Sequence, residues 1–360
     1  MGRGKKLLFL GLALLMLTVP VLAAELPPDV ERALPRDAGK LLDGVEQWDA
    51  AGLTDGLRSI WTHLRKDAGK ILRSQTRGAA SILLVVLLCS LADGFQKGTG
   101  GSGRLPVMAG TLAITALTAG SLDGLMGSGM AAAEQMNTFS KALLPTLAAV
   151  SAISGGVAGA TLRQIATVFF ADLLLELIHG LLMPMVYLYA GALAAGNSLS
   201  DKRLSAVADM IRTVCVRLLT AVLLAFTIYL TVSGIFAGTV DSARVRVTKT
   251  AISSVVPVVG GIIAEASETV LAGTGVLKGT IGVFGLLGVL ALCAYPFLQL
   301  GIQYLLYKLT GFLASVIGSP ELCALIQGLG GAFGLILGMV GSCALVLLVS
   351  ILASAAAVTA

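Results

Sequence analysis

The most informative polar residues of this chain lie inside long apolar segments. Asp172, Glu176 and His179 recur at helical spacing, so one helix face carries two carboxylates and an imidazole. Ionisable groups inside a membrane are costly and usually functional. The cluster therefore predicts a wetted path or a proton relay, unless this part of the segment lies at the membrane edge, where carboxylates reach water.

A second charged group follows a proline and a glycine pair in the stretch 256–270. Proline removes a backbone donor and restricts the residue before it, and charged, irregular backbone at membrane depth is tolerated only where protein or water covers it. We expect a broken or re-entrant helix beside an aqueous path, with an ordinary loop between spans as the alternative. The candidate residues are Pro257, Gly260, Gly261, Glu265 and Glu268.

No residue spacing favours a catalytic or metal site. The five cysteines lie in or beside apolar runs without a C-x-x-C pair, and the two histidines, His63 and His179, have no ligand partner at a recognisable spacing. A literal G-x-G-x-x-G at 98–103 follows an apolar run rather than a β-strand. We therefore expect no enzymatic activity, no cofactor and no metal.

The composition identifies an integral membrane protein. Hydrophobic residues make up 56% of the chain and charged residues 12%, with a mean hydropathy of +0.91, whereas soluble domains have about 45–50% apolar and about 25% charged residues. The net charge of +5 comes from basic residues that sit mainly between apolar runs. Such residues set membrane topology, so we expect a lipid bilayer as surroundings and no nucleic acid as partner.

The N-terminal part divides into two regions. Residues 1–24 resemble a signal peptide, with a basic start and an apolar run from Leu7 to Leu22; an uncleaved first span is the alternative. Residues 25–78 form an extracytoplasmic amphipathic region. Its helical pattern from Leu53 to Leu72 predicts a helix along the membrane surface, or else a small solvated helical pair.

Residues 79–360 form a multi-span domain of an all-α, polytopic fold. Since a helix needs about 20 residues to cross the hydrocarbon core, the apolar runs give roughly six to eight crossings. With this count, no single orientation puts all the basic loops on the cytoplasmic side. One miscounted span would explain the conflict, and the small-residue run 143–162 is the most easily miscounted.

Small residues at four-residue spacing form two ladders that predict close helix contacts, within the subunit or between subunits. Leu347, beyond the second ladder, is expected to face lipid. The ladder residues are Gly155 and Gly159, and Gly330, Gly334 and Gly338.

Several motifs resemble one known family in order and distance. Val256-Pro257-Val258-Val259-Gly260 with the downstream Glu265-Ala266-Ser267-Glu268 is similar to a stretch of the stage III sporulation protein AE family. Ser154-Gly155-Gly156, Cys293-Ala294-Tyr295-Pro296 and Tyr307-Lys308-Leu309 agree as well. The resemblance extends over essentially the whole chain, although the Asp172, Glu176 and His179 cluster matches no family motif.

The resemblance implies a specific function. The family belongs to an operon of eight proteins in endospore-forming bacteria, which with a forespore-side protein build a transenvelope channel, or feeding tube, between mother cell and forespore. The AE member is its polytopic component in the mother-cell-derived outer forespore membrane, beside the AA ATPase, and has no attributed enzymatic activity. A stand-alone secondary transporter for a small solute is the alternative, and self-association remains open.

Overall fold

The computed structural model describes residues 28–45, 48, 50–98, 105–153, 157–199, 201–232 and 279–358. Within these residues the chain is helical, without strands, which confirms the all-α class. Three sequence predictions lie outside the described residues. They are the signal peptide at 1–24, Gly155, and the 256–270 stretch with Pro257, Gly260, Gly261, Glu265 and Glu268.

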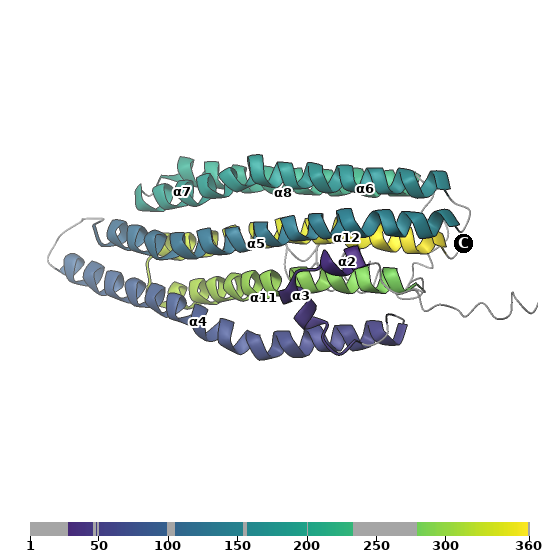
Figure 1. Cartoon of the computed structure of the whole chain (residues 1–360). Coiled ribbons are helices and arrows are strands. Elements are labelled where there is room, and N and C mark those ends of the chain that lie inside the picture. Colours follow the sequence, from purple (N-terminus) through teal and green to yellow (C-terminus); the bar gives the residue numbers. More distant parts are fainter. Residues whose placement is uncertain are drawn as a thin grey trace, which may run out of the picture.

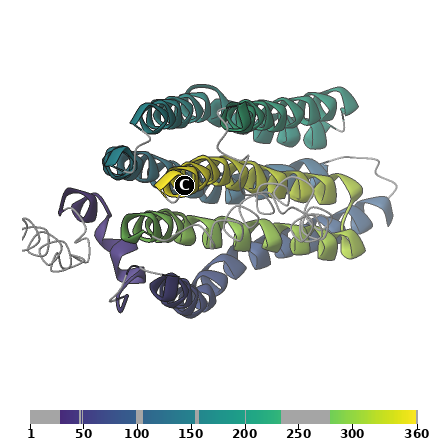
Figure 2. The same ribbon diagram turned by 90° about the vertical axis from the view of Figure 1, so that its right-hand side faces the viewer.

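Long helices lie side by side in three rows, with α6–α7 and α8 in one outer row, α5 and α12 in the middle, and α11 and α4 in the other outer row (Figures 1 and 2). Among the described residues six helices are long and apolar enough to cross a membrane, which confirms the polytopic prediction. The elements are α2 (Pro28–Arg32), α3 (Arg36–Leu41), α4 (Ala50–Gly98), α5 (Leu105–Ile153), α6 (Val157–Leu177), the π-helix η1 (Ile178–Leu182), α7 (Met183–Leu199), α8 (Lys202–Val232), α11 (Thr280–Ile317) and α12 (Pro320–Val358).

Three helix pairs turn at the same end of the bundle, on the left in Figure 1: α4 ends there and α5 begins, and likewise α7 and α8, and α11 and α12. We call it the connection end. Large apolar side chains are exposed toward this end, as expected of a lipid-facing surface. They include Leu84, Leu87, Leu88 and Leu91 of α4, Leu105, Leu112 and Leu117 of α5, and Leu305, Leu309, Phe312, Leu313 and Val316 of α11.

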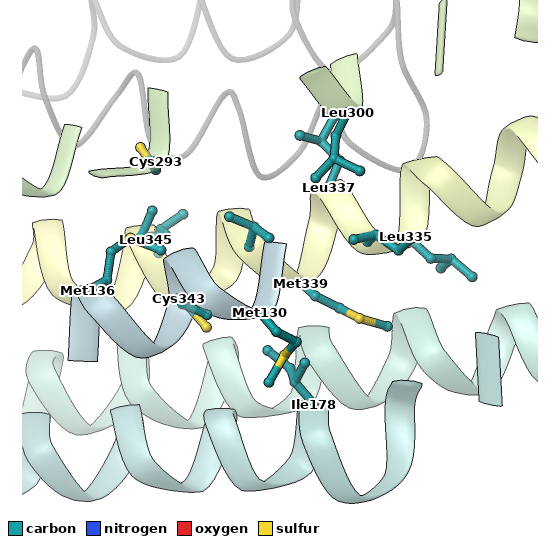
Figure 3. Packing of buried hydrophobic residues seen from close by; sticks show 14 of the residues in the cluster. Met130, Met136, Ile178, Cys293, Leu300, Leu335, Leu337, Met339, Cys343 and Leu345 are labelled. Carbon is teal, nitrogen blue, oxygen red and sulfur yellow. The ribbon is translucent and has the colours of Figure 1, made fainter. Parts of the chain in front are cut away.

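Helix α12 forms the centre of the molecule. Every residue from Leu329 to Ala353 is buried, because a helix that is apolar on all sides needs neighbours on all sides. Figure 3 shows Leu337 beside Leu300 of α11. Met339, Met130 of α5 and Ile178 of η1 line one small cavity.

The buried α12 corrects one expectation about lipid contact. Leu347 is only 2% exposed, so the expectation that it faces lipid was wrong. The side chain lies in the protein core because helices surround α12.

Helix α4 also differs from its prediction. It is one continuous helix from Ala50 to Gly98, and its amphipathic half runs beside α11 rather than apart from the spans. Leu53 and Ile60 are buried, and a Cβ on Gly56 would lie 2.5 Å from Leu287 Cδ1. The apolar stripe therefore packs on protein, which removes the reason for a helix lying flat on a membrane surface.

The expected span 143–162 does not exist as one element. Helix α5 continues through Pro145 to Ile153, and α6 begins at Val157. The run is divided between the end of one helix and the start of the next, since the Ser154-Gly155-Gly156 sequence favours a break. Without this crossing, Lys202 and Arg203 fall on the same side as Lys97, as the positive-inside rule prefers.

Candidate functional site

Polar side chains line the boundary where α5 runs antiparallel to α6, η1 and α7, and we call this boundary the α5–α7 seam. Six of its eight residues carry a carboxylate, ammonium or imidazole group and are exposed or half-buried. The other two carry an amide and a phenol. The seam consists of Asp123, Glu134, Asn137 and Lys141 of α5, Asp172 and Glu176 of α6, His179 of η1 and Tyr187 of α7.

Asp172 is the best-connected residue of the seam. Lys141 Nζ lies 2.8 Å from Asp172 Oδ1, and Asn137 Nδ2 donates a 2.8 Å hydrogen bond to the same oxygen. The Lys141 and Asp172 side chains are each 47% exposed. In water such a half-exposed pair contributes at most about 1 kcal/mol, so its main effect is to fix the register of α5 against α6.

A second contact lies farther along the seam. The Tyr187 hydroxyl donates a 2.7 Å hydrogen bond to Asp123 Oδ1. The two contacts bracket Glu134 on α5 and Glu176 on α6, so the antiparallel register places both carboxylates on the middle stretch of the seam. Both are exposed, and neither has an ion-pair partner within the described parts of the chain.

The helix opposite α5 changes its winding beside these carboxylates. In η1 the Met183 N–H bonds to the carbonyl of Ile178, five residues back. Pro184 follows directly and lacks the N–H that an α-helix would direct at the carbonyl of Gly180. A π-turn accommodates the proline and presents His179 and Gly180 on the exposed side.

The sequence placed Asp172, Glu176 and His179 on one face, and the structure places all three at the seam. It does not join them: Asp172 is engaged by Lys141 and Asn137, and within the described ranges no hydrogen bond links it to Glu176 or His179. The described residues thus show no direct hydrogen-bonded chain through these three side chains, and the wetted path or proton relay stays a prediction. No group of three or more His, Cys, Asp or Glu side chains could hold a metal ion in the described residues.

A polar recess of about 400 Å³ lies at the connection end, between α4, α5 and the α11–α12 turn. The Ser90 hydroxyl donates to the Ile317 carbonyl at 2.7 Å, and Ser319 Oγ is buried without a hydrogen-bond partner in the described structure. Asp93 and Glu321 also line the recess. Two carboxylates and two hydroxyls suit water or a cationic group better than an apolar ligand.

The glycine ladder of α12 lies inside the subunit. A Cβ on Gly330 would lie 3.1 Å from Tyr307 Cβ of α11, and Gly334 and Gly338 are buried. The Ser342 hydroxyl donates to the Gly338 carbonyl at 2.8 Å within the same helix. The α12 ladder thus serves packing within one chain, and Gly159 lies in the first turn of α6.

Sequence reasoning missed the α5 half of the seam. The polar positions Asp123, Glu134, Asn137 and Lys141 are separated by multiples of three to four residues and so share one helix face. This periodicity was present in the sequence, but a mostly apolar run with single polar residues does not reveal which helix it faces.

Comparisons with known proteins agree with the resemblance seen in the sequence. A family model for stage III sporulation protein AE matches residues 46–358. A curated relative, the stage III sporulation protein AE of Bacillus subtilis (strain 168), is 24% identical over 285 residues, which are 78% of this chain and 70% of the relative. No solved structure matches the chain.

Proposed function

Because this chain belongs to the stage III sporulation protein AE family, we propose that it is a membrane-embedded structural and permease-like component of the sporulation channel joining mother cell and forespore. One observation carries the proposal: the family match spans 46–358 and so includes all six long apolar helices. A scaffold of this kind needs no catalytic group, so we propose that the protein is not an enzyme.

The lengths of the helices support a role that extends beyond the bilayer. Helices α4 and α5 have 49 residues each, about 74 Å at 1.5 Å per residue, against a hydrocarbon core of about 30 Å. We propose that the connection end, with its exposed apolar side chains, lies in the outer forespore membrane. The opposite end then projects toward the space between the two membranes.

The basic residues at the connection end support the same orientation. Helix α8 begins at the connection end with Lys202 and Arg203, and basic residues prefer the cytoplasmic side. We propose that this end faces the mother-cell cytoplasm, where the AA ATPase would bind. The N-terminal half of α4 then faces the forespore-side channel protein.

Purification from sporulating cells tests the function. A tagged, full-length copy should co-purify with other stage III channel proteins, including the AA ATPase, and its deletion should arrest forespore development. A protein isolated alone, with normal sporulation after its deletion, would favour a stand-alone secondary transporter instead.

A further inference from the structure

We propose that the outer face of α4 in one copy docks on the α5–α7 seam of a second copy of this chain, so that copies anchored in the same membrane associate head to tail. The inference does not depend on the channel assignment. It follows from the charges of two faces and from their level along the bundle.

The outer face of α4 is strongly basic over its first half. Among the described residues only Lys70 has an ion-pair partner there, Asp67, at 3.3 Å. The remaining cations have none, so the face is available to an acidic partner. The exposed basic residues are Arg58, Arg65, Lys66, Lys70, Arg73 and Arg77.

An aromatic side chain accompanies these cations. Trp61 is 68% exposed and lies about one helical turn from Arg58 and Arg65. Tryptophan and arginine are the residue types most enriched at the energetic centres of protein interfaces. The face therefore has the character of a protein-binding surface.

The seam has the opposite charge. Its carboxylates Asp123, Glu134, Asp172 and Glu176 outnumber the ammonium of Lys141. Glu134 and Glu176, at its middle, are the two without an ion-pair partner in the described ranges. A basic helix laid along the seam would meet them directly.

A buried acceptor at the seam also lacks a donor. Asn137 is 8% exposed and donates to Asp172, but its own Oδ1 has no hydrogen-bond partner in the described structure. Buried polar atoms are normally satisfied, and an orphaned one is costly. This oxygen is covered within one copy, so it marks an incompletely satisfied polar contact between α5 and α6 rather than a group that a docked α4 could reach.

The two faces lie at the same level along the bundle. Helices α4 and α5 contact adjacent residues of α11, which shows their relative level. Gly56 of α4 packs on Leu287, and Phe139 of α5 approaches the neighbouring Gly288. Farther along, Gln75 Nε2 donates to the Gln299 carbonyl at 3.2 Å, and Gly129 of α5 approaches Leu300. Both charged faces also have similar lengths, about 28 Å from Arg58 to Arg77 and about 27 Å from Asp123 to Lys141.

The faces cannot meet within one copy. Helix α4 lies in one outer row and α6–α7 in the other, with α5 and α12 between them (Figures 1 and 2). The α4 face and the seam lie at the same height along the bundle. A second copy that is rotated about an axis parallel to the bundle can therefore place its seam against the α4 face of the first copy without sliding along that axis. Two different patches in contact define a head-to-tail interface, which forms rings when the rotation closes.

Crosslinking between differently tagged copies tests the interface. In a full-length background without the native cysteines, Arg65→Cys copies are co-expressed with Glu176→Cys copies and treated with a short bis-maleimide in membranes. We expect a crosslinked product containing both tags. Replacing the second partner with Arg203→Cys, where α8 begins at the connection end, is the matched control and should give background only. Equal yields from both pairs would overturn the proposal.

Exchanging the charges of the α4 face and the seam shows whether a second copy of the chain, rather than another molecule, covers these faces. Arg65→Glu with Arg73→Glu, or Glu134→Lys with Glu176→Lys, should each abolish the crosslink formed by cysteines at Lys66 and Gly180, and the combined four-residue variant should restore it. Unchanged helicity by circular dichroism shows that each variant is folded. Loss without restoration means that another protein or anionic lipid headgroups cover these faces, and would overturn the proposal.

Discussion

Lys141 of α5 and Asp172 of α6 form an ion pair of 2.8 Å that closes one end of the α5–α7 seam, and Asn137 donates to the same carboxylate oxygen. Three polar groups from two helices thus share one contact. The pair fixes how α5 lies against the helix that carries Glu176 and His179.

The ion pair gives the first prediction. Lys141→Ala should lower the free energy of unfolding by about 1 kcal/mol or less if water reaches the pair, and by about 3 kcal/mol or more if another chain covers it and leaves Asp172 unpaired. Thermal unfolding of the purified protein in detergent measures the difference. Lys40→Ala, which removes the exposed ion pair with Asp37 in α3, is the control and should change little.

Gly330 gives a prediction about packing. Gly330→Leu should destabilise the protein by about 1–3 kcal/mol or prevent folding, because the new side chain would enter the contact with Tyr307. Gly301→Leu is the matched control, since a Cβ there meets nothing within 4 Å. Equal stability of the two variants, measured by thermal unfolding, would show that α11 and α12 are not held in this contact.

A hydrogen bond between α5 and α11 gives the third prediction. The Tyr307 hydroxyl lies 2.9 Å from Thr118 Oγ1, and both residues are buried. Tyr307→Phe should therefore cost about 1 kcal/mol of stability. Tyr295→Phe, which changes an exposed tyrosine of the same helix, should be neutral; a similar loss in both variants would contradict the buried contact.

The proposed orientation predicts which side of the membrane each end of the bundle faces. In a cysteine-free background, Lys66→Cys on α4 should react with a membrane-impermeant thiol reagent added outside intact cells before engulfment. Arg203→Cys at the connection end should react only after permeabilisation. The reverse pattern would invert the orientation of the protein.

The stretch 256–270 remains a sequence prediction. If it forms a broken helix beside water, cysteines at Glu265 and Glu268 should be accessible to a polar thiol reagent while those at Ile262 and Ile263 are protected. Uniform reactivity along the stretch would identify an ordinary loop. Charge reversal at both glutamates should impair forespore development while the protein stays in the membrane.

The sequence by itself determined the class of the protein. The chain has apolar runs longer than a bilayer crossing, few charges and many small residues. In lipid such runs form helices, because a helix satisfies its backbone hydrogen bonds within the segment. It also placed Asp172, Glu176 and His179 on one face, because helical periodicity depends only on neighbours along the chain. The family resemblance likewise rests on local motifs.

Only the tertiary structure decided which faces meet. Periodicity identified the buried stripe of α4 but not its neighbour α11, so a membrane surface seemed as suitable as a protein surface for Leu53 and Ile60. The partners of Asp172 lie on a different helix, and no local pattern specifies a contact between segments so far apart in sequence. Leu347 shows the same limit: an apolar residue can face lipid or protein equally well, and its burial depends on the helices that surround α12.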